Sequence, residues 1–258
     1  MQLNQVAAQL YTLRDYLKTP AEIAATLKKV RAIGYQAVQV SGMGEIAEDE
    51  LARILQGEGL VCCATHESSD KILNEPQWVA ERLQKLNCKF TAYPFPGGVD
   101  MNDFSQVTGL AKRLDAAGAV LWELGLTLAY HNHSHEFIRH QGKSVLQHLY
   151  ELTAPQHLQG EIDTYWVQAG GGDPAAWCRY LKNRLPLLHM KDFAVSAQIQ
   201  PMFAEIGQGN LDWRGIIQAA QQSGCQWYIV EQDTCPGDPF TSLATSFHYI
   251  SEELADTR

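Results

Sequence analysis

Residues 130–137, with the sequence YHNHSHEF, place three histidines and a glutamate within six positions: His131, His133, His135 and Glu136. Imidazole and carboxylate groups are ligands of divalent metals, and imidazole also carries protons near neutral pH. Crowding such groups is costly unless something holds them, and a cation would satisfy both kinds of group at once. The segment therefore predicts chemistry with a metal ion at its centre.

Other polar side chains end short apolar runs elsewhere in the chain: His66, Asp163, His189, Lys191, Asp192, Glu231 and Asp233. Imidazoles with several carboxylates and no thiolate suit one divalent ion, Mn²⁺, Mg²⁺, Co²⁺ or Zn²⁺, without choosing among them. Taken singly, each residue has a structural alternative. Asp163 could cap a helix, and Lys191 could be only an ion-pair partner of Asp192 or a neighbouring glutamate. Glu231 follows an apolar run, and a buried glutamate without a partner is expensive, which favours a site role.

The elements that position these residues follow a repeating pattern, in which short β-rich runs alternate with stretches of helical periodicity. Eight strands are predicted, at residues 5–12, 35–41, 60–66, 89–95, 126–132, 159–165, 185–191 and 226–232. Eight strands each followed by a helix predict an α/β fold, a (β/α)8 TIM barrel, as a single domain over residues 1–258. The catalytic face of such a barrel is built at the strand C-terminal ends, so the polar residues should meet at one mouth.

The helices carry recognisable end signals. In TPAEIAATLKKVRAIG, Thr19 suits the N-cap, Pro20 the first helical position and Gly34 the end. Residues 101–125 predict a long helix that Gly118 could interrupt. A doubly wound sheet is the structural alternative, but it usually has a glycine fingerprint after its first strand, and QLYTLRDYLKTP has none.

Composition excludes several classes of partner. The 20 Lys and Arg against 29 Asp and Glu give a net charge of -9, which disfavours nucleic acid and anionic membranes. The six cysteines show no CxxC spacing, and the N-terminus shows no signal-peptide pattern, so we expect a cytoplasmic protein with free thiols. No apolar run approaches the length of a membrane span. A homo-oligomer is compatible with these features, although no interface signal is evident.

Five segments together resemble a known family: YHNHSHEF, EIDTYWVQAGGGDP, LLHMKDF, EIGQGNLDW and WYIVEQDTCPGDP. They are similar to the sugar phosphate isomerase/epimerase group of the xylose isomerase-like barrels, over about residues 5–250. The resemblance implies one divalent metal held from strands five to eight, with Asp163, His189 and Glu231 matching the last three ligands. At the fifth strand many relatives have glutamate where this chain has His131. Either His131 is the ligand or Glu136 folds back to supply a carboxylate, and we favour Glu136.

The resemblance implies a metal-dependent isomerase or epimerase of a keto-sugar or related polyol, acting through an enediolate in carbohydrate metabolism. A carboxylate at the edge of the metal suits the first base, which we assign to Glu231. His133 shares strand parity with His131 and is the expected second proton carrier near this mouth. Lys191 would steady a substrate oxygen. Further substrate contacts are expected from Tyr11, His66 and Trp166.

The substrate itself is only faintly indicated. The loop EIGQGN, residues 205–210, could present backbone amides to a phosphate. Lys191 is, however, the only clear cation in the motifs, which favours an unphosphorylated keto-sugar, keto-glycoside or inosose. One alternative is a lyase, such as an inosose or dehydroshikimate-type dehydratase. Another is a barrel that binds a sugar or metal without turnover, whereas an endonuclease would need a basic groove.

Overall fold

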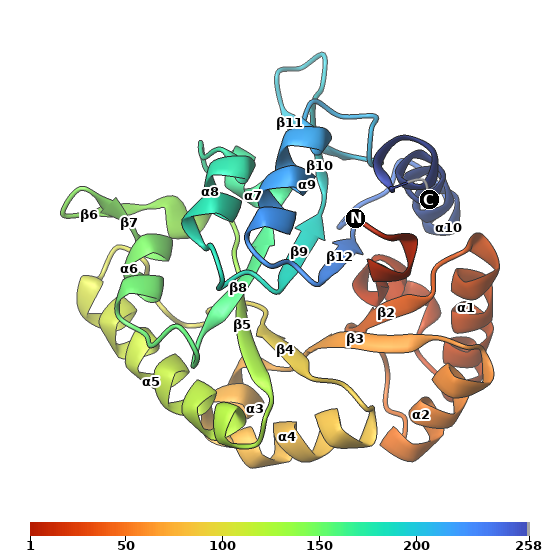
Figure 1. The fold of residues 1–258 in the computed structure, drawn as a ribbon, viewed down its shortest axis with the longest axis horizontal. Helices are drawn as coiled ribbons and strands as arrows, with labels where there is room; N and C mark the ends of the chain where they lie inside the picture. The colour runs from red at the N-terminus through yellow and green to blue at the C-terminus, as the bar shows by residue number, and fades with distance from the viewer. Residues whose placement is uncertain (257–258) are drawn as a thin grey trace.

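The eight predicted strands pair into one closed parallel barrel, surrounded by helices (Figure 1). The computed structural model describes residues 1–256. Around the barrel the strands lie in the order β1-β12-β9-β8-β5-β4-β3-β2, which confirms the predicted (β/α)8 barrel. The strands are β1 (Val6–Gln9), β2 (Ala37–Val40), β3 (Val61–His66), β4 (Phe90–Tyr93), β5 (Thr127–His131), β8 (Gln159–Asp163), β9 (Leu187–Met190) and β12 (Trp227–Val230).

Local end signals place the helices as predicted. Before α1, the Thr19 hydroxyl accepts the Glu22 backbone N–H while the Glu22 carboxylate accepts the Thr19 N–H, and Gly34 ends the helix at a φ of 128°. Within residues 1–256, no helix has both the length and the hydropathy to cross a bilayer. The helices are α1 (Pro20–Ile33), α2 (Glu48–Gly57), α3 (Ser69–Asn74), α4 (Pro76–Lys85), α5 (Phe104–Glu123), α6 (Val145–Glu151), α7 (Thr164–Ala169), α8 (Pro174–Tyr180), α9 (Trp213–Gln222) and α10 (Pro239–Tyr249).

The expected interruption of the long helix at Gly118 is wrong, because α5 runs unbroken from Phe104 to Glu123. The glycine serves close packing instead. A Cβ at position 118 would lie only 1.8 Å from the backbone oxygen of His157, in the segment that leads into β8. Only the hydrogen atom of a glycine side chain fits between α5 and the segment before β8.

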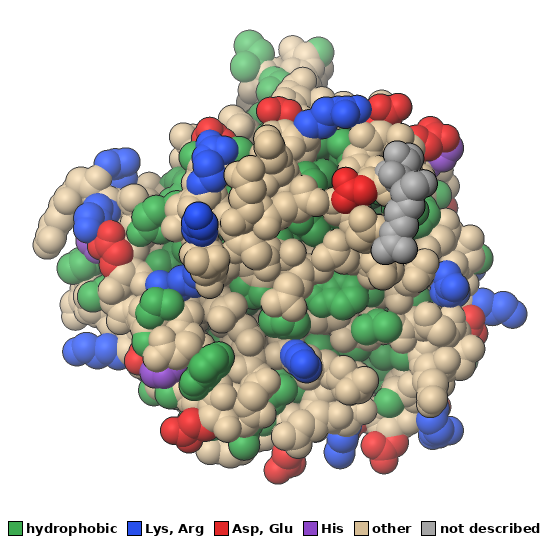
Figure 2. Space-filling model, viewed as in Figure 1, with side chains coloured by type: hydrophobic (Ala, Val, Ile, Leu, Met, Phe, Trp, Pro, Cys, Tyr) green, Lys and Arg blue, Asp and Glu red, His purple; other side chains and the backbone are tan. Residues whose placement is uncertain are grey.

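Two small antiparallel hairpins that we did not predict interrupt the alternation of strand and helix. They are β6–β7 (Arg139–His140 and Lys143–Ser144) and β10–β11 (Asp192–Val195 and Pro201–Ala204). The second hairpin projects beyond the outline of the barrel, and hydrophobic side chains lie at its tip (Figures 1 and 2). The exposed hydrophobic residues there are Val195, Ile199 and Met202.

The barrel interior is layered. One layer is an apolar plug of mostly small side chains, separate from the larger core between strands and helices. Its buried members are Ala7, Ala37, Cys63, Ala64, Phe90, Ala92, Ala129, Leu187 and Ile229. Further along the same strands, toward their C-terminal ends, the interior residues become polar: Gln9, Gln39, Glu161, Asp163 and His189 are all buried. The plug closes the barrel on one side of these polar groups, so ligands must approach them from the C-terminal mouth.

Replacing Gly118 by alanine should lower the free energy of unfolding by about 1–3 kcal/mol, because the added methyl group overlaps a backbone oxygen. Gly109 in the same helix is the matched control, since a Cβ there meets no atom within 4 Å. Gly109→Ala should stabilise the protein by up to about 1 kcal/mol through helix propensity. Denaturant unfolding of both variants checks this, and equal effects at the two positions would contradict the packing role of Gly118.

Candidate active site

Four side chains from neighbouring strands meet at the C-terminal end of the barrel. His131 ends β5, Asp163 ends β8, His189 lies in β9, and Glu231 directly follows β12. The strand register pairs Asp163 with His189 and His131 with Glu161. One donor atom from each of His131, Asp163, His189 and Glu231 lies within 4.8 Å of all the others, and all four residues are buried. The expected meeting of Asp163, His189 and Glu231 is thus seen in the structure.

The electrostatic field at this group is strongly negative. Burial alone would lower the pKa of His189, but the carboxylates of Glu161 and Glu231 outweigh it and raise the pKa to about 10. Burial raises the pKa of Asp163 to about 6, although Lys191 opposes the shift. Asp163 Oδ2 also accepts no well-aligned hydrogen bond. A negative field beside converging nitrogen and oxygen donors fits a divalent cation, so this group could hold one.

Lys191 is buried among carboxylates. Its Nζ lies 2.8 Å from Glu231 Oε2, 3.0 Å from Asp163 Oδ2 and 3.1 Å from Asp233 Oδ1. Burial favours the neutral amine, but these three charges outweigh it and raise the pKa of Lys191 above its usual range. Lys191 is therefore an ammonium group at the wall of the site. Its partners are these three carboxylates, and the suggested pairing with Asp192 is not formed.

Glu136, which we favoured as the fifth-strand ligand, lies apart from the converging donors. Its Oε1 accepts a hydrogen bond from the Tyr130 hydroxyl at 2.8 Å, and its Oε2 accepts the His133 backbone N–H at 2.8 Å. Burial raises the pKa of this carboxyl group. Both oxygens of Glu136 are thus already occupied by hydrogen bonds around the turn after β5. The geometry therefore favours the alternative, in which His131 is the metal ligand from this strand.

A cavity of about 540 Å³ opens over the group, within the usual size range of small-molecule sites. Six residues of the predicted site line it: Tyr11, His66, His131, His133, Lys191 and Glu231. Trp166 does not line the cavity, but the centre of its indole ring lies 5.4 Å from the centre of the His133 ring. Two further lining residues were not predicted: Arg14, in the 3-10 helix Leu10–Tyr16 after β1, and Phe95, in the loop after β4.

His133 is placed as expected but differs in its protonation. Burial and the neighbouring His131 ring lower the pKa of His133 to about 2. The ring is therefore neutral and a very weak base, so it can accept a hydrogen bond from a substrate hydroxyl but does not take up a proton near neutral pH, where we had expected a proton carrier. It does not hold a spare proton ready to donate.

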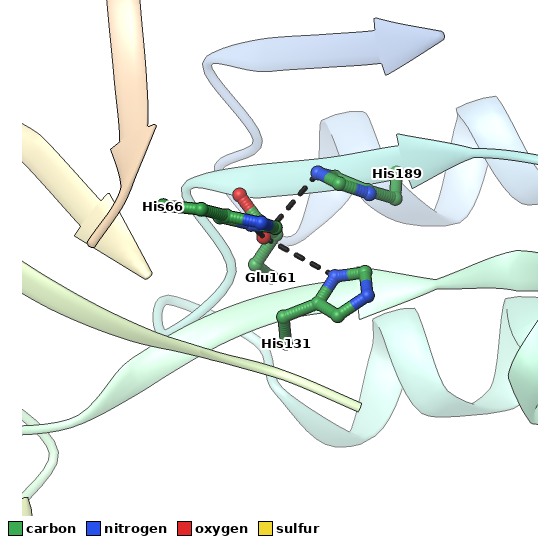
Figure 3. A group of neighbouring side chains, drawn as sticks. All are labelled: His66, His131, Glu161 and His189. Atoms are coloured by element: carbon green, nitrogen blue, oxygen red, sulfur yellow. Dashed lines mark hydrogen bonds and ion pairs between the residues drawn. The ribbon is translucent and has the colours of Figure 1, made fainter. Parts of the chain in front are cut away.

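Glu161 is the buried residue that the sequence analysis missed. Its Oε2 lies 2.5 Å from His66 Nε2 and 3.3 Å from both His131 Nδ1 and His189 Nε2 (Figure 3). Burial would raise the pKa of Glu161, but His189 and His66 hold it well below the usual value. The sequence could have indicated this residue. Glu161 is a charged residue inside a strand, and it lies two positions before Asp163, so both side chains point to the same face of the strand.

The loop at residues 205–210 does not offer the phosphate cradle that we considered. Asp192 Oδ2 accepts the backbone N–H groups of Gly207 at 2.9 Å and Gly209 at 3.1 Å, and also the indole N–H of Trp213 at 2.8 Å. Its Oδ1 accepts the Phe193 N–H at 2.8 Å. The amides that could have bound an anion are thus already bonded to a carboxylate of the chain.

Comparisons with known proteins agree with this architecture. The family model described as xylose isomerase-like TIM barrel matches residues 27–250. A curated inosose dehydratase from Lacticaseibacillus casei is 27% identical over 162 residues, which are 56% of this chain and 54% of that protein. The chain therefore spans about half the length of this relative.

Two solved structures show the same fold. A sugar phosphate isomerase/epimerase from Parabacteroides distasonis ATCC 8503 superposes with a TM-score of 0.83 at 20% identity, covering 98% of this chain and 96% of that one. An L-ribulose 3-epimerase superposes with a TM-score of 0.73 at 14% identity, covering 97% and 94% of the two chains. At these identities the likeness concerns the fold.

Replacing Asp192 by alanine should destabilise the protein by at least about 2 kcal/mol, because it leaves several N–H groups without an acceptor. Amide hydrogen exchange should rise at residues 207 and 209. Asp238→Ala is the control, since Asp238 caps α10 at the surface through one backbone N–H, and its loss should cost about 1 kcal/mol. Unchanged exchange at residues 207 and 209 would contradict the anchoring role.

Proposed function

The chain belongs to the xylose isomerase-like TIM barrel family, and on that premise we propose that it is a divalent-metal-dependent isomerase or epimerase. The proposed substrate is a keto-sugar or related polyol, which reacts through an enediolate. One observation carries the proposal: four metal-capable donors converge at the base of a cavity whose wall also carries a carboxylate, a neutral imidazole and an ammonium group.

The proposed cofactor is one divalent ion, Mn²⁺, Mg²⁺, Co²⁺ or Zn²⁺, held by His131, Asp163, His189 and Glu231. A bound divalent ion would acidify a substrate C–H between a carbonyl and a hydroxyl, because the developing negative charge falls on oxygens that face a cation. The donor set supports this choice, since borderline and hard ions accept mixed imidazole and carboxylate ligands.

The side chains at the cavity wall then handle protons and charge. Glu231 contacts Lys191 and His189 through the same oxygen, Oε2, which leaves Oε1 for a substrate proton. The pKa of Glu231 is held well below its usual value, because Lys191 and His189 outweigh the effect of burial, so the residue starts as a carboxylate. The neutral His133 accepts a hydrogen bond from a substrate hydroxyl on the second side. The ammonium group of Lys191, held by its three carboxylate partners, places a positive charge beside a substrate oxygen.

The surroundings support an unphosphorylated substrate. Asp192 takes up the amides of residues 207 and 209, so these two N–H groups are not free to bind a phosphate. The partly exposed rings of Tyr11 and Phe95 line the cavity and offer faces for the C–H groups of a sugar or cyclitol. We therefore propose a keto-sugar, keto-glycoside or inosose.

A dehydratase is the second candidate, favoured by the curated relative named inosose dehydratase and by a histidine at position 131, where the family resemblance leads us to expect glutamate. Both reactions begin with removal of a proton from carbon. They differ in whether that proton returns or a β-hydroxyl departs as water. Mass spectrometry of the product separates them, because only the dehydratase product has lost one water.

Glu231→Gln should reduce exchange of a substrate C–H with deuterated solvent by at least about 100-fold, because the amide cannot accept the proton. A screen over keto-sugars and cyclitols with the wild-type protein first identifies an exchanging compound. Circular dichroism and metal content are measured on the same samples, and Glu151→Gln, at the end of the outer helix α6, serves as the control. Exchange at the wild-type rate would refute Glu231 as the base. Bound metal without exchange of any compound would indicate a binding barrel.

His131→Gln should weaken binding of the divalent ion more than about tenfold, since even changes to residues behind a ligand cost that much. Glu136→Gln is the paired variant. A glutamine there can still accept the His133 N–H and bond to the Tyr130 hydroxyl, so metal affinity should stay within a few-fold of the wild type. Chelator competition and elemental analysis measure both. The reverse ranking would restore Glu136 as the ligand from the fifth strand.

A further inference from the structure

We propose that Glu161 is a positioning residue that keeps the protons of His131 and His189 on the nitrogens facing away from the ion, so that the opposite nitrogens can bind it. This inference rests on the proposed function, because it concerns the same metal ligands. Glu161 is fully buried in β8 and does not line the cavity, so it acts through the two imidazoles rather than on a substrate.

The directions of the hydrogen bonds around His189 follow from one fact, that a carboxylate only accepts. Glu161 Oε1 accepts from Gln39 Nε2 at 2.6 Å, so the amide oxygen of Gln39 faces the other way. That oxygen accepts from Gln9 Nε2 at 2.7 Å and lies 2.6 Å from His189 Nε2. Because an amide oxygen cannot donate, His189 must carry a proton on Nε2. Its Nδ1, 3.0 Å from Glu231 Oε2, is then the nitrogen available to an ion.

His131 is ordered by the second oxygen of the same carboxylate. Its Nδ1 lies 3.3 Å from Glu161 Oε2, close but not well aligned for a hydrogen bond, whereas its Nε2 lies 4.0 Å from Asp163 Oδ2. A neutral imidazole carries one proton, and the nitrogen nearer to a buried carboxylate is the favoured place for it. Nε2 is therefore left with its lone pair on the side of the converging donors.

In the network of His66, Gln9, Gln39, Glu161 and His189, the hydrogen bonds form without an ion, whereas Nδ1 of His131 faces Glu161 without a well-aligned hydrogen bond. His66 donates from Nε2 to Glu161 Oε2, and its Nδ1 lies 3.4 Å from Gln9 Nε2, which is a donor. The donors of His66, His131, Glu161 and His189 also lie within 4.8 Å of one another (Figure 3). A cation there would have to displace the Nε2 proton of His189 and break its bond to Gln39. One ion is therefore expected, held by His131, Asp163, His189 and Glu231.

The first test reads the proton positions directly. Protein with ¹⁵N-labelled histidine is loaded with Zn²⁺, and long-range ¹H–¹⁵N correlation spectra assign the tautomer of each ring. We expect a proton on Nδ1 of His131 and on Nε2 of His189. This test needs no variant, so it stands even if a change at position 161 prevents folding. A proton on Nε2 of His131 or on Nδ1 of His189 would overturn the proposal.

The second test measures affinity. Glu161→Gln should weaken Zn²⁺ binding 10- to 100-fold, the range typical of residues that orient metal-bound histidines, and should shift the visible absorption spectrum of bound Co²⁺. Adding Gln39→Glu returns a carboxylate beside His189 Nε2 and should recover affinity. Asp115→Asn is the control, because Asp115 Oδ1 lies 3.1 Å from His157 Nδ1, a carboxylate–imidazole pair between the outer helix α5 and the segment before β8. It should leave Zn²⁺ affinity unchanged.

The outcomes separate this inference from the proposed function. A folded Glu161→Gln variant with wild-type Zn²⁺ affinity and Co²⁺ spectrum overturns the positioning role while the metal site stands. Two equivalents of Zn²⁺ in the wild type, one of them lost in Glu161→Gln, would also overturn it by making Glu161 a ligand. A wild-type protein that binds neither ion refutes the proposed function, and the inference with it.

Discussion

The burial of several carboxylates at one end of the barrel is the constraint to which the surrounding residues respond. Glu161, Asp163 and Glu231 are buried, and an unpaired buried charge is expensive. Lys191 neutralises part of this charge, and His189 takes up a proton, with its pKa raised to about 10 despite burial. A divalent cation at the same place would meet the same field and could displace that proton. The negative charge gathered here thus favours binding of a metal.

The barrel positions these charges through its strand register. Parallel strands bring residues of equal parity to the same interior level, which sets Asp163 beside His189 and His131 beside Glu161. Small apolar residues below seal the interior, and the cavity opens above. Asp192 holds the loop after β11, so the segment beside Lys191 is fixed by hydrogen bonds within the chain. The site therefore depends on backbone geometry that is set before any ligand arrives.

Local sequence was enough to predict the eight strands and the meeting of Asp163, His189 and Glu231, because strand ends and parity are short-range properties. Contacts across the barrel were not predictable in the same way. Gln9 and Gln39 lie on the neighbouring strands β1 and β2, but Glu161 comes from β8, 122 residues beyond Gln39, and only the closed barrel brings it to them.

The errors have a similar origin in long-range packing. The preference for Glu136 over His131 came from the carboxylate that the family resemblance implies at the fifth strand. It did not foresee that both oxygens of Glu136 accept hydrogen bonds from Tyr130 and His133. The glycines at 118, 207 and 209 suggested a helix break and an anion loop by their type. In the structure Gly118 lies against His157, and the other two donate to Asp192.

Anomalous diffraction from crystals grown with Mn²⁺ tests the central claim most directly. We expect one anomalous peak, within about 2.0–2.4 Å of donor atoms of His131, Asp163, His189 and Glu231, at the C-terminal mouth. A peak centred instead among His66, His131, Glu161 and His189, or no peak in the barrel at saturating Mn²⁺, would contradict it.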